Sequence, residues 1–90
     1  MNDGPYKVAV APAARRALQR LPEKIAAACV EFILGPLAEN PHRIGKPLMG
    51  PLEGRHSARR GAYRVIYRID DAAGRIDVTR IDHRADVYQV

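Results

Sequence analysis

The sequence predicts a single α+β domain in which two N-terminal helices pack on one face of a small antiparallel β-sheet. A short strand pattern at residues 6–10 is followed by two helical patterns and then by three strand patterns. Helices and strands that are segregated along the chain are typical of α+β folds. Ninety residues, of which 47% are hydrophobic, suffice for one core, so we expect one domain over residues 1–90.

Prolines divide the helical half of the chain. Pro12 suits the first turn of a helix, because its missing N–H has no partner there, and apolar residues at helical spacing follow it. A second helix is expected from Glu23, whose carboxylate favours a helix N-terminus. Gly35-Pro36 is unfavourable inside a helix, so we expect a break or kink there and one further turn to Glu39.

The second half predicts a β-hairpin and one more strand. Residues 41–53 contain three Pro and two Gly and are expected to form an irregular connection. The strand patterns at 54–60 and 63–69 flank a turn at Gly61-Ala62. Alternation in the second strand directs one set of side chains to the core, namely Tyr63, Val65, Tyr67 and Ile69. It directs another set to the open face, namely Arg64, Ile66 and Arg68.

The last strand pattern runs from about residue 75 to residue 82, and its phase is uneven. Ile76 and Val78 share one face, but Ile81 falls on the other. An extra residue in a strand reverses the alternation beyond it, so a β-bulge is expected near Thr79 or Arg80.

Positive charge is concentrated in the predicted hairpin. Residues 41–69 carry seven Lys or Arg against one acid, in a chain of net charge +5. If the register aligns the two hairpin strands, one basic patch forms on the open face from Arg55, Arg59, Arg64 and Arg68. Such a face on a small domain points to a polyanion, RNA first. A solvated face kept soluble by charge is the alternative.

Several other classes of function lack support in the sequence. The single cysteine, Cys29, precludes a disulfide within the chain and suits a buried position in a reducing cytoplasm. The sequence shows no signal peptide and no long apolar span, so we expect a cytoplasmic protein that does not enter membranes. No zinc-site spacing, P-loop or dinucleotide signature is present, and neither a metal nor a cofactor is expected.

A second group of chemically capable residues ends the chain. Arg84 follows the last strand closely and is expected to reach the open face. Tyr88 offers a ring that can stack on a base, or that packs under the sheet edge instead. His83 can act as an acid or base near neutral pH, although a lone surface histidine is more often chemically idle.

Two stretches carry a family resemblance: Arg-Arg-Gly-Ala-Tyr-Arg-Val-Ile-Tyr at 59–67 and Asp-His-Arg-Ala-Asp-Val-Tyr at 82–88. With Leu-Pro at 21–22, Gly-Lys-Pro-Leu at 45–48 and Leu-Glu-Gly at 52–54, the chain resembles the RelE branch of the RelE/ParE toxin superfamily. The resemblance covers nearly the whole chain. It implies a RelE-like, microbial-ribonuclease-like fold and a toxin of a type II toxin–antitoxin system. It also implies a metal-independent endoribonuclease that cleaves mRNA in the ribosomal A site.

The resemblance also implies roles for individual residues. Arg64, Arg84 and Tyr88 match the family's catalytic positions. The other residues that we expect to contact RNA are Arg55, Arg59, Arg60, Arg68, Lys46 and His83. Ser57 stands where some members have lysine, which is a departure from the basic set. Leu48 stands where YoeB-like relatives carry a glutamate general base, so the RelE-like scheme of arginines and a tyrosine fits better.

The expected partners follow from the same resemblance. They are an acidic RelB-like antitoxin, mRNA and the ribosome, with operator DNA contacted only through the antitoxin. Two alternatives stay open. One is a non-enzymatic ParE-like toxin that binds DNA gyrase, which the set Arg64, Arg84 and Tyr88 argues against. The other is an inactive relative that only binds its antitoxin, an alternative that Ser57 keeps open.

Overall fold

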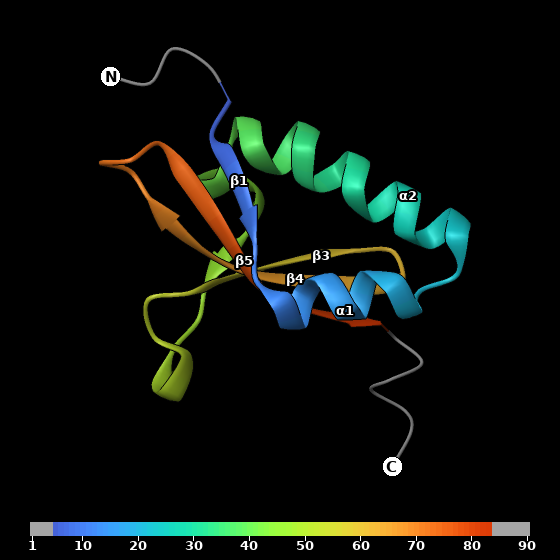
Figure 1. The fold of residues 1–90 in the computed structure, drawn as a ribbon. Helices are drawn as coiled ribbons and strands as arrows, with labels where there is room; N and C mark the ends of the chain where they lie inside the picture. The colour runs from blue at the N-terminus through green and yellow to red at the C-terminus, as the bar shows by residue number, and fades with distance from the viewer. Residues whose placement is uncertain (1–4, 84–90) are drawn as a thin grey trace.

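The structure, a computed structural model, describes residues 5–83 and contains a five-stranded sheet with helices packed against it (Figure 1). The strand order is β1-β5-β4-β3-β2. In chain order the elements are β1 (Lys7–Val10), α1 (Pro12–Arg20), α2 (Glu23–Phe32), η1 (Ile33–Leu37), α3 (Pro41–Ile44), β2 (Lys46–Pro47), η2 (Gly50–Leu52), β3 (His56–Arg60), β4 (Tyr63–Asp70) and β5 (Arg75–His83). The predicted α+β class is confirmed. Within residues 5–83, no helix is long and apolar enough to cross a membrane.

Both predicted N-terminal helices are present at the expected positions. α1 begins at Pro12 and buries Ala14 and Ala17, whose small side chains let the helix lie close to β5. α2 begins at Glu23 and buries Cys29. Burial raises the pKa of the Cys29 thiol to about 11. This cysteine is therefore an inert part of the core, because the reactive thiolate is disfavoured there.

The chain does not break at Gly35-Pro36. Instead η1 is a single π-helical turn that contains Pro36, and helical structure continues through residue 39. A π turn bonds residue i to residue i+5, so it gives room to a ring that would clash with the preceding carbonyl in an α turn. The wider turn also keeps Ile33 and Leu37 in the core. The expected kink is thus accommodated within one helical segment.

The connection over residues 41–53 is more ordered than predicted, and the expectation of a wholly irregular loop is wrong. It contains α3, β2 and the short 3₁₀ turn η2. β2 pairs antiparallel with β3, and Lys46 stands opposite Ser57. The strand is short and lies at the edge of the sheet because Pro47 has no N–H to donate.

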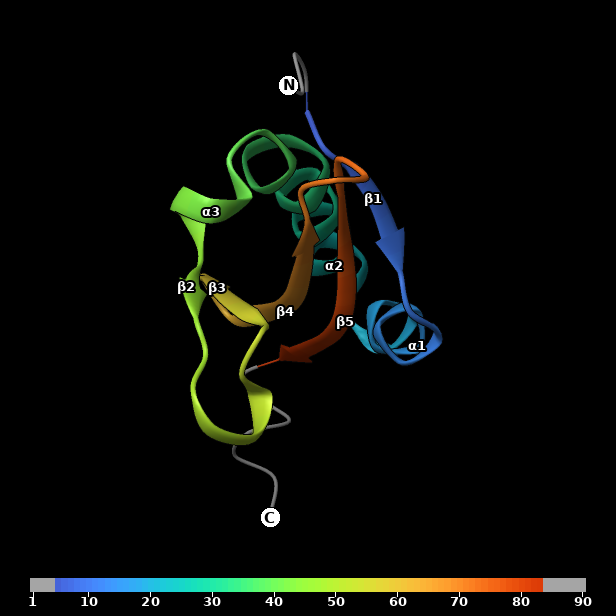
Figure 2. The ribbon, with the colours of Figure 1, turned by 90° about the vertical axis from the view of Figure 1, so that its left-hand side faces the viewer.

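The meander of β3, β4 and β5 is antiparallel, as predicted, but β1 joins β5 in parallel. Val8 of β1 stands opposite Ile76 of β5. Figure 2 shows β1 and β2 at opposite ends of the sheet, with α2 behind β4 and β5. The two helices between β1 and the meander therefore bridge the sheet and cover one of its faces.

The core lies between that face and the helices. Tyr63, Val65 and Tyr67 of β4 are buried as predicted, and Ile69 is partly buried against the same cluster. The Tyr67 hydroxyl donates to the carbonyl oxygen of Pro41 at 2.6 Å. A buried hydroxyl needs such a partner, and this bond ties α3 to the centre of the sheet.

The predicted β-bulge is confirmed in β5. Ile66 of β4 faces Arg80, whereas the next residue, Tyr67, faces Val78, so Thr79 is the extra residue. Because the bulge reverses the alternation, Ile81 returns to the core side and is 4% exposed. The same reversal decides which charged residues of β5 reach the opposite face.

Candidate nucleic-acid interface

The face of the sheet opposite the helices carries the predicted cationic patch. In the hairpin, Arg59 of β3 stands directly opposite Arg64 of β4. Arg68 lies on the same face as Arg64, four residues further along β4, and both are exposed. We call this surface the arginine face, defined by Arg59, Arg64, Arg68 and Arg80. The predicted alignment of the two hairpin strands is therefore confirmed.

The arrangement of these charges is unfavourable without an anion. Like charges directly opposite each other in a sheet repel and destabilise the strand pair. Within residues 5–83, neither Arg59 nor Arg64 has a carboxylate within salt-bridge distance. Arg55, which directly precedes β3, has its Nε shielded from solvent without a hydrogen-bond partner in the described chain. A bound phosphate would offset the opposed charges of Arg59 and Arg64, because guanidinium groups bind phosphate through paired hydrogen bonds.

The bulge brings two further residues to the arginine face that the sequence analysis missed. Asp82 stands opposite Arg64, and Arg80 stands opposite Ile66. The Arg80 Nε donates to Asp82 Oδ1 at 2.8 Å. Asp82 thus neutralises Arg80 rather than Arg64. The uneven phase of β5 was the sequence signal that could have found them. Once Thr79 is assigned as the extra residue, Arg80 and Asp82 both fall on the arginine face.

An apolar residue occupies the middle of the cationic surface. Ile66 projects to the arginine face between Arg64 and Arg68, yet it is only 5% exposed. Its cross-strand neighbours are Ser57 and Arg80. Long arginine side chains cover apolar surface with their methylene stems while keeping the charged group in water. The guanidinium groups are thus held around a closed apolar centre.

Lys46 of β2 lies directly beside Ser57 of β3. The two residues are direct cross-strand partners between β2 and β3, so their side chains share a face. Where the resemblance implies a lysine within β3, this chain has Ser57, and the neighbouring cation is Lys46 on the edge strand β2. The predicted contribution of Lys46 to the cationic surface is consistent with this placement.

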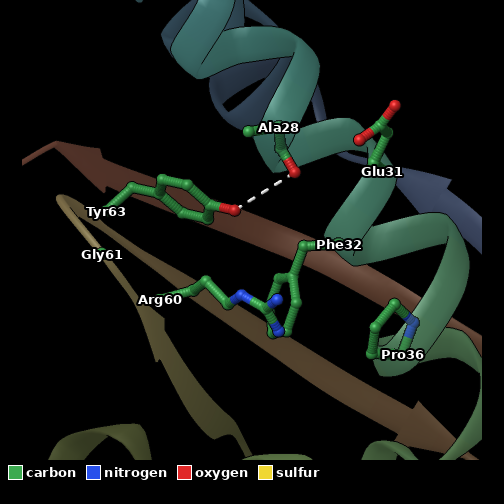
Figure 3. Close-up of a pocket in the computed structure, with 7 residues that line it drawn as sticks. All are labelled: Ala28, Glu31, Phe32, Pro36, Arg60, Gly61 and Tyr63. Atoms are coloured by element: carbon green, nitrogen blue, oxygen red, sulfur yellow. Dashed lines mark hydrogen bonds between the residues drawn. The ribbon is translucent and has the colours of Figure 1, made fainter.

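Arg60 and His83 are not brought to the arginine face. Arg60 is the cross-strand partner of Tyr63, and His83 pairs with Tyr63 from the other side. Figure 3 shows Arg60 on the helix side of the hairpin, where its guanidinium lies 5.2 Å from the centre of the Phe32 ring. The structure therefore does not join either residue to the predicted RNA contacts. Arg84 and Tyr88 lie outside the described residues.

A polar cluster at the other end of the sheet has a structural role. Asp71, in the β4–β5 turn, accepts a hydrogen bond from the Tyr6 hydroxyl at 2.6 Å and lies 2.9 Å from His42 Nε2. The two hydrogen bonds lower the pKa of the Asp71 carboxyl. His56 stacks on Tyr67, with ring centres 5.6 Å apart. The cluster connects the β4–β5 turn to β1 and α3.

The pKa of His56 predicts a pH dependence of stability. Burial, and secondly the nearby His42, hold this pKa below its usual 6.5. The unfolded chain therefore binds a proton at His56 at a higher pH than the folded chain does. Stability is complete above about pH 6.5 and falls as the pH drops toward the folded-state pKa. Chemical denaturation at a series of pH values is expected to show this loss.

His56→Phe keeps a ring against Tyr67 but removes the titration. We expect the variant to be less dependent on pH between about 7 and 5 than the unmodified protein. A wild-type stability that is constant across this interval would contradict the assignment. Loss of the Asp71 interactions belongs to a more acidic range, below the ordinary carboxyl pKa of 3.8.

The fold and the arginine face together define a small α+β domain with a cationic sheet surface. Comparison with known proteins identifies its family. Residues 8–88 match the family model described as the ParE toxin of type II toxin–antitoxin system, parDE. The chain is 60% identical to Toxin RelE of Mycobacterium tuberculosis over 99% of its length and 92% of that protein. It is 52% identical to Toxin RelG of the same organism, over 94% of the chain and 98% of that protein.

A solved structure extends the likeness to three dimensions. The toxin–antitoxin complex RelBE2 of Mycobacterium tuberculosis contains a chain that matches with a TM-score of 0.89 and 50% identity, over 94% of this chain and 98% of that one. The chain belongs to the RelE/ParE superfamily of type II toxins, as a RelE-like member.

Proposed function

We propose that this RelE-like toxin is an endoribonuclease that cleaves mRNA in the ribosomal A site and is neutralised by an acidic antitoxin. The observation that carries the proposal is the opposed pair Arg59 and Arg64, exposed on the sheet and without an acidic partner in the described chain. A surface that concentrates cations without neutralising them is suited to an RNA phosphate. The names of the related toxins support the assignment to this class.

The chemistry follows from what an RNA strand supplies. The 2′-oxygen attacks the adjacent phosphorus, the 2′-O–P bond forms, and the P–O5′ bond breaks. The departing 5′-oxygen takes a proton from water. Arg64 binds the scissile phosphate and offsets the charge that develops on it. Asp82, the cross-strand neighbour of Arg64, would accept the proton of the 2′-hydroxyl, exchanging its ion pair with Arg80 for this contact. The products are a 2′,3′-cyclic phosphate and a 5′-hydroxyl, and DNA is not cleaved because it lacks the nucleophile.

Two residues of the proposed site belong to the C-terminal segment. Arg84 stabilises the 5′-oxygen as it leaves, and Tyr88 stacks on or orients the nucleotide beside the cleaved bond. β5 ends at His83, opposite Tyr63, so the chain enters this segment beside the hairpin end of the sheet. No step in the proposal requires a metal or a cofactor.

The test is direct mapping of mRNA ends. The purified protein is added to translating ribosomes, and primer extension locates new 5′ ends. We expect cleavage within codons that occupy the A site. Intact mRNA, from a protein that is folded by circular dichroism, would refute the proposal.

One observation favours a second candidate function. The matching family model is that of ParE toxins, and a ParE-like member binds DNA gyrase without cutting RNA. Inhibition of supercoiling with intact mRNA would support this alternative. The inactive-relative alternative rested on Ser57, and the neighbouring Lys46 weakens it, since the cationic surface is retained at that point.

The partner is proposed on similar grounds. The matched structure of the RelBE2 complex is that of a toxin with its antitoxin. An acidic antitoxin suits a chain of net charge +5. Operator DNA would be contacted only through that antitoxin.

A further inference from the structure

A second recognition surface lies on the opposite side of the sheet from the arginine face. It is an open pocket of about 410 Å³ between the end of α2 and the turn of the β3–β4 hairpin. Phe32 and Pro36 line it from the helical side, and Arg60 and Tyr63 line it from the hairpin (Figure 3). The proposed RNA chemistry uses none of these four residues.

The pocket has a rigid aromatic base. The Tyr63 hydroxyl donates to the carbonyl oxygen of Ala28 at 3.2 Å, which fixes the ring against α2. Phe32 and Tyr63 meet edge to face, with ring centres 6.3 Å apart, and are 5% and 6% exposed. Aromatic side chains held in this way form pockets for the apolar anchor residues of a partner.

The pocket opening carries a cation without an acidic partner. The Arg60 guanidinium packs over the Phe32 ring, and within residues 5–83 no carboxylate lies within salt-bridge distance of it. Glu31, on the helical rim, does not reach it. Arginine stacked on an aromatic ring is pre-positioned to bind a carboxylate. A ligand that complements the charge at this opening would therefore be acidic.

An exposed apolar strip lies on another face of the same helical segment. Val30 and Leu34 are 39% and 59% exposed and lie four residues apart, so they share one face of the helical segment. Leu34 is three residues from Glu31, so Glu31 separates the strip from the pocket. Together the strip and the pocket are too extended for a small ligand and suit an amphipathic segment of a protein.

We propose that this surface docks a segment of the antitoxin in which an apolar side chain enters the pocket and an acidic side chain pairs with Arg60. The proposal rests on the proposed toxin–antitoxin function and names the site for its partner. Because the surface lies across the sheet from Arg64, changes to it are expected to alter antitoxin affinity without altering the cleavage reaction.

The test measures affinity for the proposed antitoxin, a small acidic protein that we expect to be encoded next to this chain, used as the probe in titration calorimetry. Leu34→Glu and Arg60→Ala are expected to raise Kd by about tenfold or more each, because they remove an apolar contact and the anion's partner. Ile44→Glu and Met49→Glu are the controls, since these residues are also exposed apolar side chains, 41% and 88%, but lie away from the pocket. We expect their Kd to stay within about twofold of wild type.

The outcomes separate the two proposals. If the wild-type protein binds the probe, and the strip variant Leu34→Glu and the pocket variant Arg60→Ala bind it equally well, the docking surface is overturned and the toxin–antitoxin function stands. If the wild-type protein fails to bind, the toxin–antitoxin function is overturned, and the docking proposal with it. A second copy of this chain is the other partner that could cover the strip, and light scattering on the free protein tests for it. If the free protein is a dimer and Leu34→Glu dissociates it, the strip serves self-association and the proposal is overturned.

Discussion

Replacing Arg64 with alanine is expected to lower A-site cleavage by about a hundredfold or more, as loss of one contact to a developing anionic charge typically does. Arg64 projects from the central strand β4, is exposed, and lies between Arg59 on one side and Asp82 on the other. Its removal creates no cavity in the core and breaks no ion pair among the described residues. The unfolding midpoint should therefore stay close to that of the wild-type protein, and antitoxin binding should be retained.

A matched control comes from the helical side of the molecule. Arg16 is exposed on α1, so Arg16→Ala removes the same charge far from the arginine face. We expect it to cleave at the wild-type rate. Arg64→Lys retains the charge but loses the two-pronged geometry of guanidinium, so its activity should fall between those of wild type and Arg64→Ala. Full cleavage by a well-folded Arg64→Ala variant would remove the central element of the proposed mechanism.

The predictable part of this fold is the part that local patterns determine. Alternation along β4 identifies Tyr67 as a core residue and Arg64 as an outward one, because side chains of a strand point to opposite faces in turn. The uneven phase of the last strand indicates a bulge near Thr79 or Arg80 for the same reason, and the register assigns it to Thr79. The partner of β1 is not predictable in this way, since alternation specifies a strand but not the strand beside which it lies.

The site was predicted less completely than the fold, because it depends on which face of the sheet each arginine occupies and not only on how many arginines there are. Arg59 and Arg60 are adjacent in the sequence and equally basic, yet they lie on opposite sides of the sheet. Arg80 was overlooked because the bulge reverses its direction. A cluster of arginines in a sequence therefore indicates an anion-binding protein, but only the register shows which guanidinium groups act together.

The register also separates the two proposed recognition events. The arginine face would bind RNA, and the pocket beside Phe32, on the other side of the sheet, would bind the antitoxin. An antitoxin docked at the pocket inhibits cleavage only if another part of it reaches the arginine face or blocks entry to the ribosome. An antitoxin shortened to its pocket-binding segment is therefore expected to bind this protein without inhibiting cleavage.

Replacing Gly45 with alanine is expected to destabilise the fold markedly, although the change adds only one methyl group. Gly45 is buried between α3 and β2, and a Cβ there would collide with the Tyr67 hydroxyl and meet the Ser57 carbonyl oxygen at 3.0 Å. Tyr67 is fully buried and held by its 2.6 Å hydrogen bond to Pro41, so it cannot move aside. Overpacking of this kind typically costs about 1–3 kcal/mol. For a domain of this size, each kcal/mol lowers Tm by about 4–8 °C.

Gly35→Ala is the matched control for this change. No atom lies within 4 Å of the Cβ that it would add, and Gly35 belongs to the helical turn η1. Alanine is the better helix former by about 0.5–1 kcal/mol, so its Tm should equal or exceed that of wild type. Thermal denaturation of both variants measures the contrast. A Gly45→Ala protein as stable as Gly35→Ala would show that the contact with Tyr67 relaxes freely. If it does not relax, displacement of β2 also moves Lys46 away from Ser57, and RNA binding should weaken together with stability.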